Sequence, residues 1–203
     1  MDDFINLCDC PNSHDSLCQS SSQSTGTTSS TTSKTSAVTA TTSKKTNKNN
    51  SNYFTSKDSD TSYNESSATK IKLSGSSADV SGDGAALSGS TVTISKAGTY
   101  VISGKSDGVQ IKVDAGDSDD VHIVLDGVTM TNTNAAINAT KAGHVYLTLK
   151  DGTTNTLSDS SSNSDEDADA VIFSKGDLTI NGSGTLNIDA KKTTVLKPMT
   201  TFI

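Results

Sequence analysis

The segment Val121-His-Ile-Val-Leu-Asp-Gly127 returns 24 positions later as Val145-Tyr-Leu-Thr-Leu-Lys-Asp-Gly152. A third copy, Asp177-Leu-Thr-Ile-Asn-Gly-Ser-Gly-Thr-Leu-Asn-Ile188, follows an acidic insertion. Self-similarity at a period of about 20 to 30 residues is typical of architectures in which each short unit buries its apolar face only against its neighbours. The repeat therefore predicts stacked units of strand and turn.

Short alternating runs extend the pattern in both directions along the chain. Each run places Val, Ile or Leu on one face and His, Thr, Lys or Asn on the other, which is the period-two signature of a half-buried strand. In the first copy, Val121, Ile123 and Leu125 are predicted to point inward, and His122 and Val124 outward. Gly and Asp-Gly steps supply the turns. The predicted strands are 71–73, 92–94, 100–102, 109–113, 121–125, 135–139, 145–149, 155–157, 170–173, 178–180 and 186–188.

These features predict an all-β fold, and we interpret it as a parallel β-helix. The spacing of the repeat matches one coil of about three strands, the strands are short, and the core residues are small aliphatics. A β-sandwich is the alternative, because it also contains many short strands divided by turns.

Composition limits the choice of partner. The chain has 203 residues, a net charge of −7 and only 31% hydrophobic residues, and its 16 basic residues are all Lys. Nucleic acid is excluded as a partner, because there is no basic stripe for phosphates and no guanidinium to read bases. Of the 23 acidic residues only Glu65 and Glu166 are Glu, and short Asp carboxylates on turns are common ligands of hard cations.

An acidic insertion interrupts the repeat and is the candidate metal site. It places Asp159, Asp165, Glu166, Asp167 and Asp169 on one loop. Calcium takes six to eight oxygen ligands, and Asp167 and Asp169 can point the same way from extended backbone. The alternative is a solvated acidic loop without a metal.

His122 and Tyr146, one repeat apart, are the candidate carbohydrate-binding residues. Both are predicted to lie on the outward face, where they could form a sugar-contacting patch; the alternative is ordinary surface decoration. We assign no catalytic residue, because no Gly-x-Ser-x-Gly elbow is present and the chain has no Arg.

Four stretches carry a resemblance to a known family: 97–104, 121–128, 153–159 and, most specific of all, 169–186. Over residues 69 to 190 the chain resembles bacterial secreted carbohydrate-binding domain-containing proteins. The resemblance implies a right-handed parallel β-helix, bound calcium and affinity for acidic plant polysaccharide such as polygalacturonate.

Both ends of the chain depart from that family pattern. Read in another frame, the codons for the segment after Lys192 can encode a motif close to the one with which the family continues, so we interpret 191–203 as an atypical, frameshifted tail and the fold as truncated. Residues 1–19, recoded in the same way, resemble a lipoprotein signal. Residues 20–67 form a predicted disordered Ser/Thr-rich linker, and 68–190 the carbohydrate-binding domain.

The sequence thus predicts calcium-associated, non-catalytic binding of acidic polysaccharide at the bacterial cell surface, with membrane contact only through an N-terminal lipid anchor. The alternative is a lyase or hydrolase of the same substrates with active residues in missing coils. A surface adhesin is a third interpretation.

Overall fold

The computed structural model describes residues 35–39, 54–160, 168–191, 194–200 and 203, and for 35–39 the backbone only. The chain divides into two compact units, Met1–Thr32 and Ser33–Ile203, and every described residue belongs to the second. The predicted lipoprotein signal over 1–19 therefore lies outside the described residues.

The described chain is built from strands and one short 3-10 helix, η1 (Ser56–Ser59). No helix in this part of the chain is long and apolar enough to cross a membrane. The strands are β1 (Thr35–Thr39), β2 (Thr69–Gly75), β3 (Ser77–Ser81), β4 (Ala85–Ser88), β5 (Thr91–Ile94), β6 (Gly98–Asp107), β7 (Gln110–Asp114), β8 (Asp120–Asn132), β9 (Ile137–Lys141), β10 (His144–Leu149), β11 (Thr154–Asp159), β12 (Ala170–Ser174), β13 (Asp177–Gly182), β14 (Thr185–Asp189) and β15 (Thr194–Pro198).

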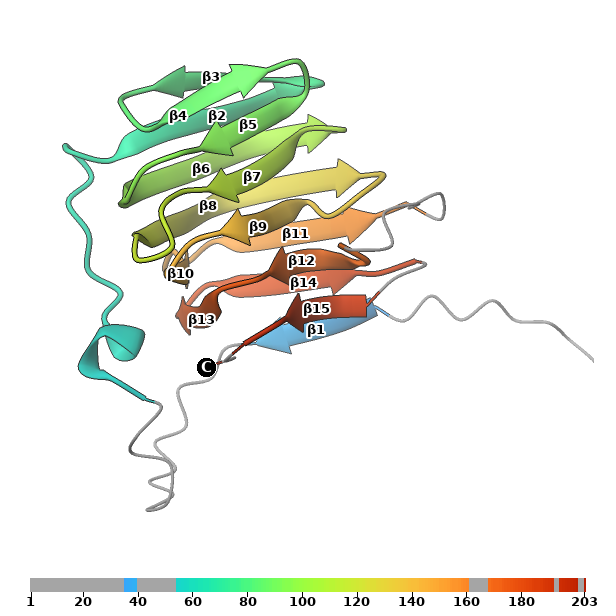
Figure 1. Cartoon of the computed structure of the whole chain (residues 1–203). Helices are drawn as coiled ribbons and strands as arrows, with labels where there is room; N and C mark the ends of the chain where they lie inside the picture. The colour runs from blue at the N-terminus through green and yellow to red at the C-terminus, as the bar shows by residue number, and fades with distance from the viewer. Residues whose placement is uncertain (1–34, 40–53, 161–167, 192–193, 201–202) are drawn as a thin grey trace, which may run out of the picture. The chain divides into compact units, whose positions relative to one another are not determined.

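The strands form two mixed sheets. One has nine strands, with the order β1-β14-β11-β8-β6-β2-β3 and with β10 and β13 on a branch from β8. The other has six strands in the order β15-β12-β9-β7-β5-β4. In Figure 1 the successive strands of each sheet lie one below another, from the β2–β5 region to β14 and β15.

The prediction of a right-handed parallel β-helix is wrong, although the fold is all-β as expected. Parallel pairs join the middle strands, but β1–β14, β2–β3 and β4–β5 are antiparallel, so the described strands form two mixed sheets. Two-residue turns at Gly75-Ser76 and Gly89-Ser90 close two hairpins, and both glycines adopt φ of 59°. Such turns match the twist of paired antiparallel strands, and a repeat argument that treats glycines only as punctuation does not detect them.

The sequence echo itself corresponds to neighbouring parallel strands. Val145 of β10 pairs with Val121 of β8 on one side and with Leu178 of β13 on the other. Val124, which is predicted to point outward, is also fully buried, but in a separate cluster with Ala68 and Val101. The inward half of the predicted alternation is confirmed, because Val121, Ile123 and Leu125 are fully buried in the main core between the two sheets. That core defines an inner face and leaves the outer face of β6, β8, β10 and β13 for other contacts.

A segment that precedes β2 crosses this outer face. We call residues 55–63 the strap; it contains η1, which contacts β13, and Tyr63, which packs against a small cluster of Ala68, Val101 and Val124. In Figure 1 the strap runs from η1 toward the start of β2. The sequence assigned these residues to the linker over 20–67, whose boundaries stay a prediction.

Candidate functional site

A row of outward side chains crosses four adjacent strands. Thr99 of β6 is the register partner of His122 in β8, His122 of Tyr146 in β10, and Tyr146 of Thr179 in β13. Neighbouring strands lie about 4.8 Å apart, so these side chains stand side by side on one face. A second row, two residues earlier on three of these strands, contains Asp120, His144 and Asp177.

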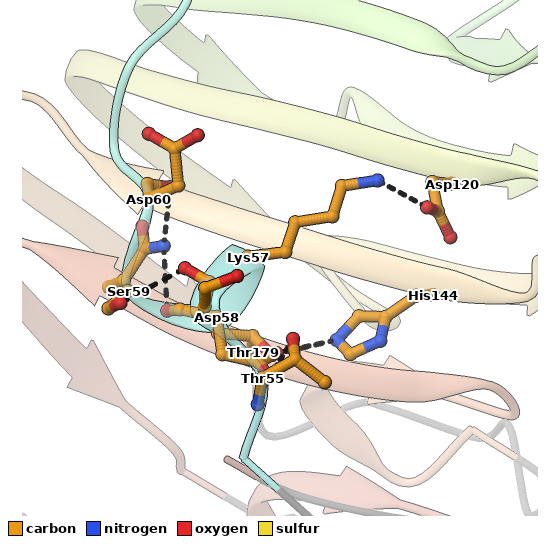
Figure 2. A network of polar contacts seen from close by, with 10 residues as sticks. Thr55, Lys57, Asp58, Ser59, Asp60, Asp120, His144 and Thr179 are labelled. Atoms are coloured by element: carbon orange, nitrogen blue, oxygen red, sulfur yellow. Dashed lines mark hydrogen bonds and ion pairs between the residues drawn. The ribbon is translucent and has the colours of Figure 1, made fainter.

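The strap is anchored on this face by Asp58, whose side chain is only 1% exposed. One carboxylate oxygen accepts a hydrogen bond from the Thr179 hydroxyl at 2.7 Å and lies 3.6 Å from His144 Nε2. The other accepts the Thr55 backbone N–H at 2.6 Å and the Thr55 hydroxyl at 2.7 Å. Figure 2 shows Asp58 at the centre of this network. A buried carboxylate needs such partners, because an unpaired one is costly.

The Thr179 hydroxyl fixes the tautomer of His144. Thr179 gives its one proton to the Asp58 carboxylate, so it can only accept from His144 Nε2, at 2.7 Å. The neutral His144 ring therefore carries its proton on Nε2, which leaves a lone pair on Nδ1.

A parallel relay holds His122. The Thr148 hydroxyl donates to Asn181 Oδ1 at 2.6 Å, so it accepts from His122 Nε2 at 2.7 Å. Asn181 Nδ2 in turn donates to the backbone carbonyls of Asp58 and Asp60, each at 3.1 Å. Both histidines thus connect the sheet to the strap through one or two side chains.

The pKa values of these groups follow from their burial and partners. Burial lowers the pKa of His122 and of His144, although nearby carboxylates, Asp60 for His122 and Asp58 for His144, oppose the shift. Burial also raises the pKa of Tyr146 to about 12, with Asp120 adding to the effect. For Asp58, burial acts to raise the pKa, but the hydrogen bonds from Thr179 and Thr55 and the nearby His144 outweigh it and bring the pKa below its ordinary value. At neutral pH the site therefore contains neutral imidazoles, a neutral phenol and an ionised Asp58.

Tyr146 is held between a ring and a cation. Its ring stacks on His144 with centroids 4.0 Å apart and planes 4° from parallel. The Lys57 ammonium lies 5.1 Å from the Tyr146 centroid and is paired with Asp120. An ammonium at this distance from a phenol ring is attracted by the π-electrons, so η1 contributes to fixing the orientation of Tyr146.

Between the strap and the sheet lies a pocket with a volume of about 230 Å³. The strap supplies Lys57, Asp60 and Ser62 to its lining, and the sheet supplies Gly98, Thr99, Asp120, His122 and Tyr146. Asp60 accepts hydrogen bonds from the Ser62 hydroxyl at 2.6 Å and from the Ser62 N–H at 2.9 Å. These bonds, above all the one from the hydroxyl, lower the pKa of Asp60. The pocket is therefore lined by hydroxyls, carboxylates, an imidazole and an ammonium, the groups that hydrogen-bond polyhydroxylated ligands.

The predicted carbohydrate-binding pair His122 and Tyr146 thus lines one pocket. The structure does not show the five predicted calcium ligands brought together in the same way. Asp165, Glu166 and Asp167 lie outside the described residues. Asp159 is fully buried and accepts the Lys191 backbone N–H, while Asp169 is paired with Lys197 at 2.5 Å. Among the residues that the structure describes, no group of three or more His, Cys, Asp or Glu side chains is placed to hold a metal ion.

Sequence reasoning missed the strap contribution. Lys57, Asp58 and Asp60 lie in a Ser/Thr-rich segment without strand periodicity. One local signal was available: Thr55-x-x-Asp58 is the spacing with which an acidic side chain hydrogen-bonds back to the residue before a helix. That signal predicts η1 but not the strands on which it packs.

Comparison with known proteins places this chain within a family. A family model described as carbohydrate-binding domain-containing protein matches residues 88–198. The chain belongs to this family. The resemblance to this family is therefore confirmed. The four stretches that carry it, and the five residues that the sheet contributes to the pocket, all lie within the matched range.

One curated relative and one solved structure show the same relationship. A carbohydrate-binding domain-containing protein from Acetivibrio thermocellus is 40% identical over 114 residues, which are 53% of this chain and 40% of the relative. The structure of a polysaccharide lyase-like protein from C. thermocellum, a gadolinium derivative, aligns with a TM-score of 0.54 at 35% identity, covering 58% of this chain and 50% of the other. This chain spans half or less of either protein's length.

Proposed function

We propose that this chain binds acidic polysaccharide in the pocket between the strap and the sheet, without cleaving it. The observation that carries the proposal is that His122 and Tyr146, both within the family-matched residues, meet in one pocket lined by polar residues. Sugar hydroxyls both donate and accept hydrogen bonds, and the pocket offers donors at Lys57 and Thr99 and an acceptor at Asp60.

The charges of the pocket indicate how an acidic sugar would bind. Asp60 and Asp120 carry two negative charges against one positive charge on Lys57, which is already paired with Asp120. A uronate carboxylate would be repelled by this arrangement unless a cation lay between. Calcium is the cation class that we propose, because it accepts many oxygen ligands from both partners.

A separate calcium site is proposed in the acidic segment 159–169, whose described residues do not line the pocket. Asp159 and Asp169 do not make a calcium site on their own, because each already has a protein partner. The proposal therefore rests on Asp165, Glu166 and Asp167, and on the related structure being a gadolinium derivative, since that hard trivalent cation also prefers oxygen ligands. We expect calcium to raise the melting temperature of the wild type and to have no effect on a D165N/E166Q/D167N variant. An equal shift in both proteins would exclude the segment.

A lyase is the second candidate, favoured by the description of the related structure as polysaccharide lyase-like. The phenol of Tyr146 is a poor base at neutral pH because its pKa is raised to about 12. His122 has the lowered pKa of a neutral imidazole, so it is the group we assign to proton abstraction if cleavage occurs.

Binding and cleavage are separated by one set of measurements on the full chain. Polygalacturonate is titrated into the protein with calcium and with a chelator, and the same mixtures are assayed for unsaturated or newly reducing chain ends. We expect calcium-dependent binding and no new ends. Thr99→Ala should weaken binding by about two- to tenfold, as for one lost hydrogen bond, while Thr93→Ala, a half-buried threonine on β5 of the other sheet, should not. New chain ends would establish the lyase. If the protein retains no glycan, a surface adhesin is the interpretation that stays.

We also propose export and display at the cell surface, supported by the Ser/Thr-rich composition of 20–67. Labelling of intact cells with a membrane-impermeant reagent tests this, and protection of the protein until lysis would contradict it.

A further inference from the structure

We propose that the strap, residues 55–63, is the specificity-determining wall of the carbohydrate pocket and is held there by the buried Asp58. This inference rests on the proposed function, because it assigns to the strap a role at the same site. The family model covers 88–198, so the strap lies outside the matched residues. It nevertheless supplies Lys57, Asp60 and Ser62 to the pocket.

The strap is fixed at its first end by contacts with residues far along the chain. Asp58 accepts a hydrogen bond from Thr179, which is 121 residues away, and the Asp58 and Asp60 carbonyls accept from Asn181. Lys57 pairs with Asp120. All of these partners lie on the outer face of β8 and β13. Each bond closes a long loop and so orders a segment whose composition alone predicts no order.

The second end is fixed by packing. Tyr63 contacts the apolar cluster of Ala68, Val101 and Val124, and its ring meets His122 edge-on, with centroids 6.1 Å apart and planes at 86°. Asp60 and Ser62 lie between this contact and the Asp58 anchor. Both are exposed, both line the pocket, and they are bonded to each other. Their position is thus set by the two ends of the strap.

The wall determines which ligand fits. With the strap in place the pocket holds about 230 Å³, below the roughly 300 to 1,000 Å³ of pockets for drug-sized ligands. This volume suits about one sugar ring, with Lys57 and Asp60 on one side and Thr99 and His122 on the other. Without the strap the same residues of the sheet form an open face with no wall. The structure therefore assigns recognition of a single sugar unit to the strap, and general adhesion to the sheet.

The experiment releases the anchor and leaves the pocket residues unchanged. Asp58→Ala is compared with wild type and with Asp79→Ala, which removes an exposed carboxylate on β3 at the opposite end of the larger sheet. Strap release is followed by limited proteolysis with cuts mapped between residues 55 and 63, and binding by titration with galacturonate oligosaccharides in the presence of calcium. We expect Asp58→Ala to be cut at least about tenfold faster in the strap and to lose at least about tenfold in affinity, and Asp79→Ala to match wild type.

A second variant covers the case in which Asp58→Ala does not fold. Lys57→Met keeps the Asp58 anchor but removes the pair with Asp120 and changes the wall, so its strap should be cut more slowly than that of Asp58→Ala while affinity is still lost. If wild type binds and Asp58→Ala, with its strap cut, binds as well or more tightly, the strap is not a wall and the inference fails while the proposed function stands. If wild type binds no glycan, the proposed function fails and the role of the strap fails with it.

Discussion

The buried side chain of Asn155 connects three strands, and its removal tests how the stacked strands are held together. Asn155 is fully buried at the second position of β11. Its Oδ1 accepts the backbone N–H of Val128 in β8 at 2.9 Å. Its Nδ2 donates to the Thr185 carbonyl in β14 at 3.3 Å and to the Thr153 hydroxyl at 3.2 Å. We consider the substitution Asn155→Ala.

The cost follows from the groups that the substitution leaves without these partners. A buried N–H such as that of Val128, deprived of its acceptor, costs about 1 to 3 kcal/mol, and a weakly bonded carbonyl costs less because it has a second lone pair. The cavity left by the amide adds a further increment of about 1 kcal/mol at most. We expect Asn155→Ala to lower the free energy of unfolding by about 2 to 4 kcal/mol.

Urea denaturation followed by far-UV circular dichroism measures this difference. The matched control is Asn187→Ala, a half-buried asparagine on the neighbouring strand β14, for which we expect less than about 0.5 kcal/mol. A loss for Asn155→Ala no larger than that of the control would refute the argument that this amide joins the three strands.

Three further outcomes follow from the same structure. Burial lowers the pKa of His122 and His144 below the ordinary value of 6.5. The unfolded state therefore binds more protons than the folded state below about pH 6.5, so the stability of the protein should fall as the pH falls through this range. His→Gln at either position should flatten a plot of melting temperature against pH from 8 to 5. Alkaline titration of tyrosine absorbance should show one group near pH 12 that Tyr146→Phe abolishes; its persistence in the variant would contradict the assignment. Gly104 has a φ of 92°, and the Cβ of Gly104→Ala would lie 2.4 Å from the Leu73 carbonyl oxygen; this variant should lose about 2 kcal/mol or more of unfolding free energy in urea denaturation. Gly127 has a φ of 71°, but its added Cβ would meet no atom of the described residues within 4 Å, so Gly127→Ala should lose about 1 kcal/mol.

Periodicity in the sequence located the strands well, because it reports local burial. Each predicted run from 71–73 to 186–188 overlaps a strand of the structure. The echo of Val121 at Val145 also reflects direct pairing of β8 with β10. Identical burial at equivalent positions is what stacked parallel strands require, so a repeat carries information on register as well as on strand positions.

The repeat did not predict how the strands pair. Whether a sheet is parallel or mixed depends on its turns, which a repeat of strand positions does not describe. Gly75-Ser76 and Gly89-Ser90 reverse the chain within two residues and produce antiparallel pairs. A Gly-Ser step also occurs at Gly182-Ser183, where it leads from β13 to β14 without pairing the two strands. Only the pairing of Ser74 with Ser77, and of Ser88 with Thr91, distinguishes a hairpin from such a connection.

Only the part of the candidate site that lies on the repeated strands could be predicted from the sequence. His122 and Tyr146 are related by the repeat, so the sequence could place them side by side. Asp58 and Thr179 are related by nothing in the sequence, since 121 residues separate them and the first lies in a segment of low complexity. Side chains that meet through tertiary packing alone leave no local pattern.

The directions of the hydrogen bonds bear on which ligand the site selects. The Thr148 hydroxyl donates to Asn181, and the Thr179 hydroxyl donates to Asp58. His122 and His144 must therefore both donate through Nε2 and keep a lone pair on Nδ1. Of these two histidines only His122 lines the pocket, where Asp60 and Asp120 are further acceptors and the Lys57 ammonium is already paired with Asp120. A hydroxyl can donate to such groups directly, whereas a carboxylate, which only accepts, cannot. Neutral hydroxyls of an acidic polysaccharide should therefore contact the protein directly and its carboxylates only through a cation, so a chelator should weaken the binding of a uronate oligosaccharide far more than that of its carboxyl-reduced counterpart.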